Sequence, residues 1–226
     1  MKTFAIITAA GSGSRFSPGK KTVPKQYTRI KGKPVILYSL ETFQKSRHID
    51  EILVSANRIY FDFIHSLAVK NGITKLTTLV EGGKTRFVSV KNAFLQIKGK
   101  AGDLVLIHDA ARPNINKKLI ELLLTNALRY GEVIPGIKIS ETVKKESKGI
   151  IKRTVDRRNL WTVQTPQAFR FDVLTKAYKK SGRRYDFTDE AELAEHAGCK
   201  VRLIEGSSDN IKITTKEDLS LLKRLM

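Results

Sequence analysis

The chain has 226 residues, of which 41% are hydrophobic, and this is enough apolar material for one well-packed core in a domain slightly larger than average. No stretch approaches the ~20 apolar residues that a membrane-spanning helix needs. The first three residues run directly into an apolar segment, which leaves no room for a signal peptide, and the single cysteine, Cys199, cannot form an internal disulfide. These features exclude a disulfide-stapled or membrane-spanning protein and predict a cytoplasmic one.

Charge is the least ordinary property of the composition. Lysine and arginine number 42 against 22 aspartate and glutamate residues, which gives a net charge of +20. Such a field attracts polyphosphates and also binds nucleic acid without sequence specificity. The lysines are scattered, however, with no long basic tail and no basic run interleaved with aromatic residues. A small anionic substrate accounts for the charge as well as RNA does, so an RNA-binding module is an alternative, but we expect no specific nucleic-acid partner.

Apolar runs typical of strands alternate with amphipathic stretches typical of helices along the first half of the chain. Strands are expected at residues 4–8, 51–55, 76–80 and 103–107. Helices are expected at residues 34–45, 60–70, 85–97 and 116–129. This alternation predicts an α/β fold with a Rossmann-like, mostly parallel sheet flanked by helices and joined by right-handed crossovers. Residues 1–226 are expected to form a single domain.

Residues 140–164 interrupt this rhythm. Segments 141–149 and 150–155 are typical of two strands joined by the polar turn Ser147-Lys148-Gly149. A hairpin with so few apolar residues cannot form a core of its own. We therefore expect a protruding β-hairpin arm that either lies on the main body or reaches a partner.

The first predicted strand ends in a glycine-rich loop, Thr8-Ala-Ala-Gly-Ser-Gly-Ser-Arg15. Glycine lets backbone N–H groups approach an anion closely, and the Arg15 guanidinium adds a charge that is not lost. Lys25, in Pro24-Lys-Gln26, is a second cation placed to return to the same loop. Neither common glycine fingerprint fits, because Gly13 is not followed by Lys-Ser/Thr and Phe16 stands where the third glycine of G-x-G-x-x-G belongs. The pairing of loop and cations predicts a nucleoside triphosphate site, and a plain glycine–serine turn is the alternative.

Two further polar segments follow predicted strands, namely His108-Asp-Ala-Ala-Arg-Pro113 and Glu81-Gly-Gly-Lys-Thr-Arg86. Open parallel sheets bind ligands at the carboxyl ends of their strands. Asp109 there suits a sugar hydroxyl or a Mg²⁺ ion held by phosphates, and an ion pair with an arginine that closes the loop is the alternative. Ser89, one turn into the next helix, is placed to meet a ribose hydroxyl if the glycine pair is more than a turn. His108 is expected to be structural.

The last third of the chain holds three more polar segments. Val155-Asp-Arg-Arg-Asn-Leu-Trp161 is dense in polar and aromatic residues, although Asp156 with Arg157 is also typical of a surface ion pair. Thr188-Asp-Glu-Ala191 indicates a helix start with threonine or aspartate as the N-cap. Residues 209–214 predict a short strand in which Lys212 either reaches to solvent or binds an anion.

These segments together resemble one family, the 2-C-methyl-D-erythritol 4-phosphate cytidylyltransferases of the non-mevalonate isoprenoid pathway. Each motif is weak alone, but seven in order over nearly the whole chain are specific. A related family, the ribitol-5-phosphate cytidylyltransferases, shares the glycine-loop, Thr-Pro-Gln and Asn-Ile-Lys motifs and is the alternative. The Thr-Asp-Glu-Ala form favours the methylerythritol family. The motifs are Ala9-Ala-Gly-x-Gly-x-Arg15, Pro24-Lys-Gln26, His108-Asp-Ala-Ala-Arg-Pro113, Val155-Asp-Arg157 with Leu160-Trp161, Thr165-Pro-Gln167, Thr188-Asp-Glu-Ala191 and Asn210-Ile-Lys212.

The resemblance implies transfer of CMP from CTP to methylerythritol phosphate, with pyrophosphate as the other product and Mg²⁺ as the cofactor. Arg15 and Lys25 would be the catalytic cations on the CTP phosphates. Phosphates would supply most of the ligands of the Mg²⁺ ion, and Asp109 would be the one candidate metal ligand from the protein. The CTP site would be lined by Ala9, Ala10, Gly11, Gly13, Gly83, Ser89, Asp109 and Ala110. The acceptor would be held by Asp109, Arg112, Thr142, Arg157, Thr188 and Lys212.

The resemblance also implies a homodimer in which the 140–164 arm crosses to the other subunit, so that Thr142 and Arg157 would serve the partner's site. Three features depart from the family pattern. Phe16 replaces the usual methionine, residues 17–22 make the phosphate loop longer or different in composition, and Ile139-Ser-Glu-Thr142 lacks the aspartate that usually precedes the threonine. The third departure bears on acceptor specificity rather than on nucleotide chemistry.

Overall fold

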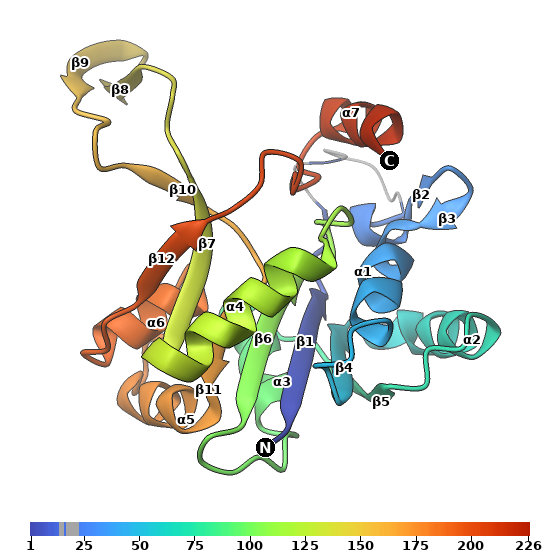
Figure 1. Cartoon of the computed structure of the whole chain (residues 1–226). Coiled ribbons are helices and arrows are strands. Elements are labelled where there is room, and N and C mark those ends of the chain that lie inside the picture. The colour runs from blue at the N-terminus through green and yellow to red at the C-terminus, as the bar shows by residue number, and fades with distance from the viewer. Residues whose placement is uncertain (14–15, 17–22) are drawn as a thin grey trace.

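A mixed β-sheet forms the centre of the molecule, with the strand order β10-β7-β11-β6-β1-β4-β5 and with β12 beside β7 (Figure 1). The computed structural model describes residues 1–13, 16 and 23–226, so Arg15 and the departures at 17–22 lie outside the described residues. The strands of this sheet are β1 (Thr3–Ala9), β4 (Glu51–Ala56), β5 (Leu76–Glu81), β6 (Leu104–Asp109), β7 (Glu132–Lys138), β10 (Trp161–Val163), β11 (Gln167–Arg170) and β12 (Arg202–Glu205).

Parallel pairing of β1 with both of its neighbours sets the register of the sheet. Thr8 on β1 lies opposite Ser55 on β4 and opposite Asp109 on β6. The carboxyl ends of these strands therefore meet at one edge, where the glycine loop also begins. β11 runs antiparallel to both β6 and β7, and β10 runs antiparallel to β7. The other pairs, β1 with β4, β1 with β6, β4 with β5 and β7 with β12, are parallel, which confirms the expected Rossmann-like, mostly parallel sheet.

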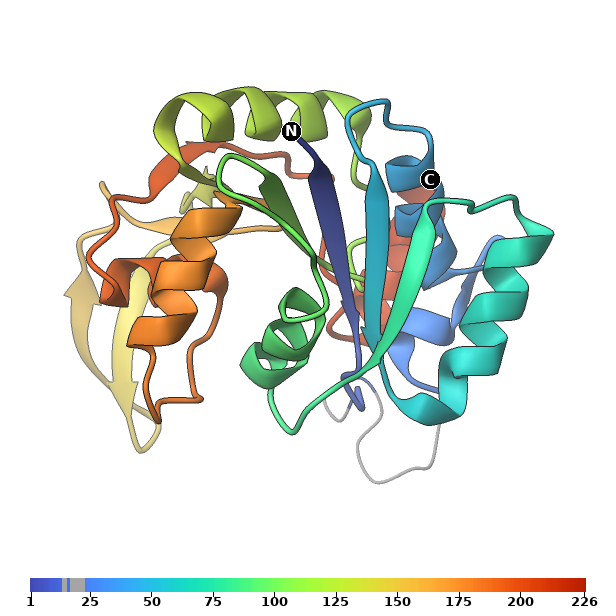
Figure 2. The same ribbon diagram turned by 90° about the horizontal axis from the view of Figure 1, so that it is seen from below.

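Helices cover both faces of the sheet because successive residues of each buried strand point to opposite sides. Ala5 and Ile7 of β1 pack under α1, α2 and α4, whereas Phe4 and Ile6 pack under α3, α5 and α6. Figure 2 shows α4 and α3 on opposite sides of the sheet. The helices are α1 (Val35–Gln44), α2 (Phe61–Lys70), α3 (Arg86–Phe94), α4 (Lys117–Tyr130), α5 (Phe171–Lys180), α6 (Glu190–His196) and α7 (Lys216–Leu225).

Short elements complete the body of the protein. Two 3-10 helices, η1 (Lys25–Tyr27) and η2 (Arg58–Tyr60), precede longer elements, and β2 (Arg29–Ile30) pairs with β3 (Lys33–Pro34). All strands and helices expected within residues 4–129 are present and differ from expectation only at their ends. None of the helices within the described residues has the length and apolar character that crossing a membrane requires.

The strand expected at residues 209–214 is wrong, because this segment is irregular. The Ile213 N–H donates to the Ala111 carbonyl oxygen at 2.8 Å instead of joining a strand ladder. Ile213 is fully buried with Leu222 of α7, and Ile211 packs against the same cluster. A pattern of alternating apolar residues predicted a strand, but here the isoleucines anchor a segment that crosses the edge of the sheet.

The predicted arm is confirmed as a hairpin separate from the main sheet. β8 (Val143–Ser147) pairs antiparallel with β9 (Ile150–Val155) through a turn in which Lys148 and Gly149 have φ values of 55° and 76°. Two positive φ values are typical of the type I′ turn that matches the twist of a hairpin. The arm projects from the body (Figure 1), and its tip leaves Ile150 and Ile151 each 62% exposed.

Candidate active site

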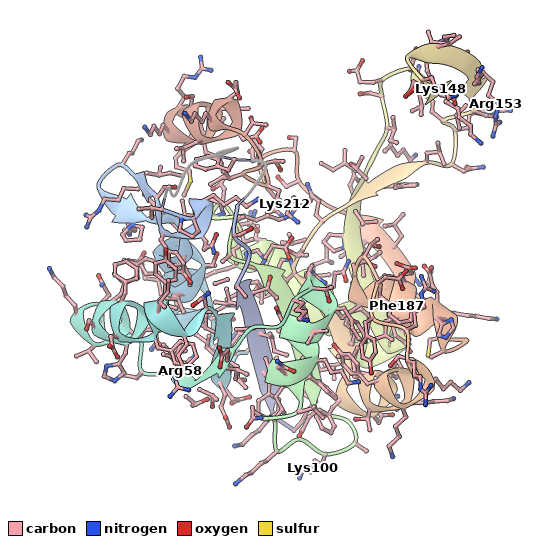
Figure 3. The ribbon with its side chains drawn as sticks, turned by 180° about the vertical axis from the view of Figure 1, so that it is seen from behind. Arg58, Lys100, Lys148, Arg153, Phe187 and Lys212 are labelled. Atoms are coloured by element: carbon pink, nitrogen blue, oxygen red, sulfur yellow. The ribbon has the colours of Figure 1, made fainter. Side chains whose placement is uncertain are left out.

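A cleft of about 410 Å³ opens where the loops after β1, β5 and β6 meet, a volume within the range of roughly 300–1,000 Å³ typical of small-molecule sites. Figure 3 shows Lys212 at this end of the sheet, opposite the end marked by Lys100. Half of the predicted site residues that lie in described segments line this cleft, from five separate parts of the chain. They are Ala10, Gly11, Lys25, Gly83, Ser89, Asp109 and Lys212.

Glycines bring the first two loops into direct contact. A Cβ atom on Gly82 would lie 2.2 Å from the Cβ of Ala10, so only glycine permits this approach. The Gly83 N–H donates to the Ser89 hydroxyl oxygen at 3.0 Å, and that hydroxyl donates to the Thr85 carbonyl at 2.9 Å. Ser89 thus stabilises the glycine turn through hydrogen bonds, and its expected contact with ribose stays a prediction.

The Pro-Lys-Gln segment binds the back of the glycine loop. The Gln26 side-chain amide donates to the carbonyl oxygens of Ala9 at 2.6 Å and Gly11 at 2.9 Å, and the Tyr27 hydroxyl donates to Ala9 at 3.1 Å. The Lys25 ammonium donates to the Ile213 carbonyl oxygen at 2.6 Å. Gln26 and Tyr27 thus bring this segment back to the glycine loop, and Lys25 lines the cleft together with Ala10 and Gly11.

Asp109 is the acidic centre of the cleft. Its Oδ1 accepts hydrogen bonds from Arg86 Nε at 3.0 Å and from the Thr8 hydroxyl at 3.2 Å, and its Oδ2 lies 2.5 Å from Lys212 Nζ. Burial alone would raise the pKa of Asp109, but Arg86 and Lys212 outweigh burial and hold this pKa well below its ordinary value. The carboxylate is consequently ionised throughout the physiological range.

Arg86 and Glu190 form an ion pair behind Asp109 that the sequence did not reveal. Arg86 Nη1 lies 2.7 Å from Glu190 Oε2, and the Glu190 side chain is fully buried. Glu190 was assigned to a helix start, and Asp109 was expected to pair with Arg112 if it closed its own loop. Both residues lie in motifs that also carry predicted site residues, Arg86 in Glu81–Arg86 and Glu190 in Thr188–Ala191. A charged side chain in such a motif is the signal that could have identified them.

A second hollow of about 150 Å³ adjoins the cleft and shares Arg86, Asp109 and Lys212 with it. Arg112 and Thr188, both predicted acceptor ligands, line this hollow. Arg112 Nη1 also donates to the Asn210 carbonyl oxygen at 2.6 Å, which ties the segment before Lys212 to the loop after β6. Part of the predicted nucleotide residues and four of the six predicted acceptor residues therefore line two neighbouring spaces with a common wall.

Other predicted residues lie elsewhere. Ala9 and Ala110 are buried behind the cleft. Gly13 has a φ of +72°, a backbone conformation that glycine adopts more readily than other residues. Thr142 and Arg157 lie at the base of the arm and not in the cleft of their own protomer, and the Arg157 guanidinium donates to the Ser140 carbonyl oxygen. Their contribution to a site stays a prediction.

A larger hollow, about 500 Å³, lies between α2 and β5. It is lined mainly by apolar side chains and threonines, and His65 is the one titratable residue in its lining among the described residues. It lacks the cations that a triphosphate requires, so size alone does not identify the site.

Mg²⁺ fits the cleft only as an ion shared with substrate. The described residues contain no group of three or more His, Cys, Asp or Glu side chains that could hold a metal. Mg²⁺ is usually bound through one or two carboxylates together with substrate phosphates and water. The ionised carboxylate of Asp109 meets that requirement, and it is the candidate protein ligand in this cleft.

His108 lies beneath the cleft and is fully buried. Its Nδ1 is 3.1 Å from the Thr165 hydroxyl oxygen, and its Nε2 is 3.2 Å from the Ser39 hydroxyl oxygen and 3.1 Å from the Arg112 carbonyl oxygen. Burial lowers the pKa of His108 to about 3. The ring is therefore neutral at pH 7, and its contacts agree with the structural role expected for it.

A glycine-rich loop at the end of the first strand, backed by lysine and facing an ionised aspartate in a doubly covered parallel sheet, defines a nucleotidyltransferase. A model of the 2-C-methyl-D-erythritol 4-phosphate cytidylyltransferase family matches residues 3–226. The chain belongs to this family.

Individual relatives are similar over their full lengths. The 2-C-methyl-D-erythritol 4-phosphate cytidylyltransferase of Caldicellulosiruptor bescii is 40% identical over 226 residues, which cover 100% of this chain and 98% of that one. The crystal structure of the Francisella tularensis enzyme of the same name has a TM-score of 0.84 at 33% identity and covers 100% of both chains. The structure of 4-diphosphocytidyl-2C-methyl-D-erythritol synthase from Anaerococcus prevotii has a TM-score of 0.84 at 28% identity, with 99% and 95% of the two chains covered.

We predict that acid destabilises the fold through His108. Its pKa is about 3 in the folded protein and near 6.5 in an unfolded chain, so the unfolded state takes up the proton first as the pH falls. The contribution is complete above about pH 6.5 and decreases toward pH 3, with about 2 kcal/mol lost between pH 7 and pH 5. Urea unfolding at both values should show this loss in the wild type and in the exposed control His65→Gln, but not in His108→Gln. An equal loss in His108→Gln would contradict the prediction.

Proposed function

We propose that the cleft binds CTP and that the adjoining hollow binds the phosphate of 2-C-methyl-D-erythritol 4-phosphate. The activity is that of the family, transfer of a cytidylyl group from CTP to this acceptor in the non-mevalonate isoprenoid pathway. The products are 4-diphosphocytidyl-2-C-methyl-D-erythritol and pyrophosphate. The observation that carries the assignment of the two subsites is the Lys212–Asp109 pair, at 2.5 Å, in the wall that both spaces share.

In this proposal the acceptor phosphate oxygen attacks the α-phosphorus of CTP in line and expels pyrophosphate. A phosphate dianion is already a nucleophile, so no side chain has to remove a proton or form a covalent bond. The residues act by positioning the reactants and by stabilising negative charge as it develops. Lys25 and Arg15 would bind the CTP phosphates, and Lys212 would leave Asp109 for the acceptor phosphate.

The remaining predicted residues take supporting positions. The backbone of Ala10 and Gly11 would face the nucleotide, with Gly83 beside the cytosine. Arg112 and Thr188 would border the acceptor. Mg²⁺, when bound, neutralises phosphate charge and orients the triphosphate, and Asp109 would hold it together with those phosphates.

The assignment predicts selectivity for one nucleotide and one acceptor. Pyrophosphate release should be measured with each of the four nucleoside triphosphates, against methylerythritol phosphate and against ribitol 5-phosphate. We expect turnover with CTP and methylerythritol phosphate. Preference for ribitol 5-phosphate would instead indicate the related family, and the absence of turnover with CTP and either acceptor would refute the proposal.

If the reaction takes place in the cleft, removing one of its cations should lower turnover. Lys25→Ala is expected to lower turnover at saturating CTP by roughly 10²–10³, the usual cost of losing a charge contact in the transition state. Arg15→Ala should have a comparable effect. Lys70→Ala, at the exposed end of α2, is the matched control and should retain full turnover.

Lys212→Ala should weaken the acceptor far more than CTP. Losing a hydrogen-bonded charge typically costs about 1.5–3 kcal/mol, so KM for methylerythritol phosphate should rise roughly 10–100-fold. Steady-state kinetics with each substrate varied in turn measures the difference. Lys216→Ala removes an exposed lysine from the first turn of α7 and serves as control. A rise in KM for CTP alone would contradict the assignment.

We further propose that residues 1–226 act as one nucleotidyltransferase domain whose arm completes the site of a second copy. The motivation is that Thr142 and Arg157 lie at the base of a hairpin whose tip leaves two isoleucines exposed. Figure 3 shows this hairpin, marked by Lys148 and Arg153, projecting from the body. A hairpin of this kind buries little within its own chain. In a two-fold symmetric dimer, each arm would lie over the partner's cleft.

Mixing two inactive variants tests the shared site. Arg157→Ala and Lys25→Ala would lie in different subunits of each composite site, so a mixed dimer would hold one site with both changes and one with neither. Random exchange makes about half of the dimers mixed, and roughly a quarter of wild-type turnover should therefore return. A monomer in sedimentation, or no recovery after demonstrated subunit exchange, would refute the shared site.

A further inference from the structure

Glu190 is a buried carboxylate that the mechanism above does not use. It begins α6, directly after the N-cap Asp189, and its side chain has no exposed surface. Its Oε1 has no hydrogen-bond partner among the described residues, and its Oε2 lies 2.7 Å from Arg86 Nη1. A buried charge is costly unless it is paired, so the position of Glu190 depends on Arg86.

Arg86 connects this carboxylate to the reaction centre. Its planar guanidinium reaches Glu190 through Nη1 and Asp109 through Nε, at 2.7 Å and 3.0 Å. Nη2 is buried without a hydrogen-bond partner in the described parts of the chain. Burial would lower the pKa of Arg86, but Glu190 and Asp109 outweigh it and raise the pKa above its ordinary value. The guanidinium is a permanent cation fixed between two carboxylates.

The segments that carry Arg86 and Glu190 are joined to each other by a further hydrogen bond. Thr85 caps α3 by accepting from the Val88 N–H at 3.2 Å, and its hydroxyl donates to the Tyr185 carbonyl oxygen at 3.2 Å. The segment that leads into α6 is therefore fastened to the helix that carries Arg86. Arg86 and Glu190 have little freedom to move apart.

Arg86 and Lys212, the two cations that contact Asp109, both line the two spaces, but they are held differently. Lys212 sits on an irregular segment and its side chain is 35% exposed, whereas Arg86 is held from behind by Glu190. When Lys212 leaves for a phosphate, one oxygen of Asp109 loses its partner. Arg86 would then be the remaining charged group that fixes the orientation of Asp109.

We propose that Arg86 and Glu190 are positioning residues, and that their buried ion pair holds Asp109 in place while the substrates occupy the site. The inference rests on the proposed function, because it concerns the geometry of the same cleft. Neither residue is assigned a contact with substrate. A displacement of about 1 Å at a reacting group can cost on the order of 10²-fold in rate.

Variants that keep size but change charge test this role. Glu190→Gln, Arg86→Gln and the double variant R86Q/E190Q should each lower kcat by about 10–100-fold, with KM for CTP changed less than about threefold. Arg86→Lys keeps the charge and should recover part of the loss. Thermal unfolding, measured in parallel, shows which variants are folded at the assay temperature, and the double variant avoids a single unpaired buried charge.

The split between kcat and KM, together with rescue by Arg86→Lys, separates positioning from a general effect on folding. A variant that only lost stability would regain turnover at a lower assay temperature, whereas a mispositioned Asp109 would keep kcat low in the folded protein.

Arg170→Gln is the matched control, because it breaks an arginine–aspartate pair with a 2.6 Å contact to Asp172 at the opposite end of β6. It should leave kcat unchanged. Wild-type kcat in the folded double variant, or an Arg86→Lys variant no better than Arg86→Gln, would each overturn the positioning role. Absence of pyrophosphate release by the wild type would instead refute the proposed function itself.

Discussion

The parallel pairing of β1 with β6 is the constraint on which the rest of the site depends. It places Thr8 directly opposite Asp109, so the glycine loop and the acidic centre start from adjacent points at one edge of the sheet. The Thr8 hydroxyl also donates to Asp109 at 3.2 Å. β5, one strand beyond β4, delivers the glycine pair that Ala10 contacts. Residues separated by about a hundred positions in sequence thereby become neighbours without any long loop.

Within that frame, alternating charges allow several ionised groups to be buried together. Glu190, Arg86, Asp109 and Lys212 follow one another with opposite signs at contacts of 2.7, 3.0 and 2.5 Å. Asp109 has two cationic partners, which hold its pKa well below the ordinary value in spite of burial, whereas burial raises the pKa of Glu190 against the opposing effect of Arg86. The net charge of +20 is carried mainly elsewhere on the chain, where it can attract anionic substrates from a distance.

The sequence predicted the elements that depend on local pattern and missed those that depend on contact. Apolar periodicity located β1, β6 and α4, and the glycine loop with Lys25 located the cleft. Glu190 was expected only as an acidic residue at a helix start, because its partner Arg86 lies 104 positions away, a pairing that no local pattern contains. Residues 209–214 alternated like a strand, but tertiary packing under α7 overrode that preference.

The irregular path of that segment also has a mechanistic consequence. A strand would fix Lys212 to the sheet through a ladder of backbone hydrogen bonds, whereas here the segment is held on either side of Lys212, at Asn210 by Arg112 and at Ile213 by Ala111. The lysine is therefore anchored at its flanks while its side chain remains 35% exposed. Such a residue can exchange its contact with Asp109 for one with a phosphate without displacing the backbone. In the proposed mechanism, arrival of the acceptor phosphate therefore separates Lys212 from the Asp109 carboxylate, which Arg86 continues to hold.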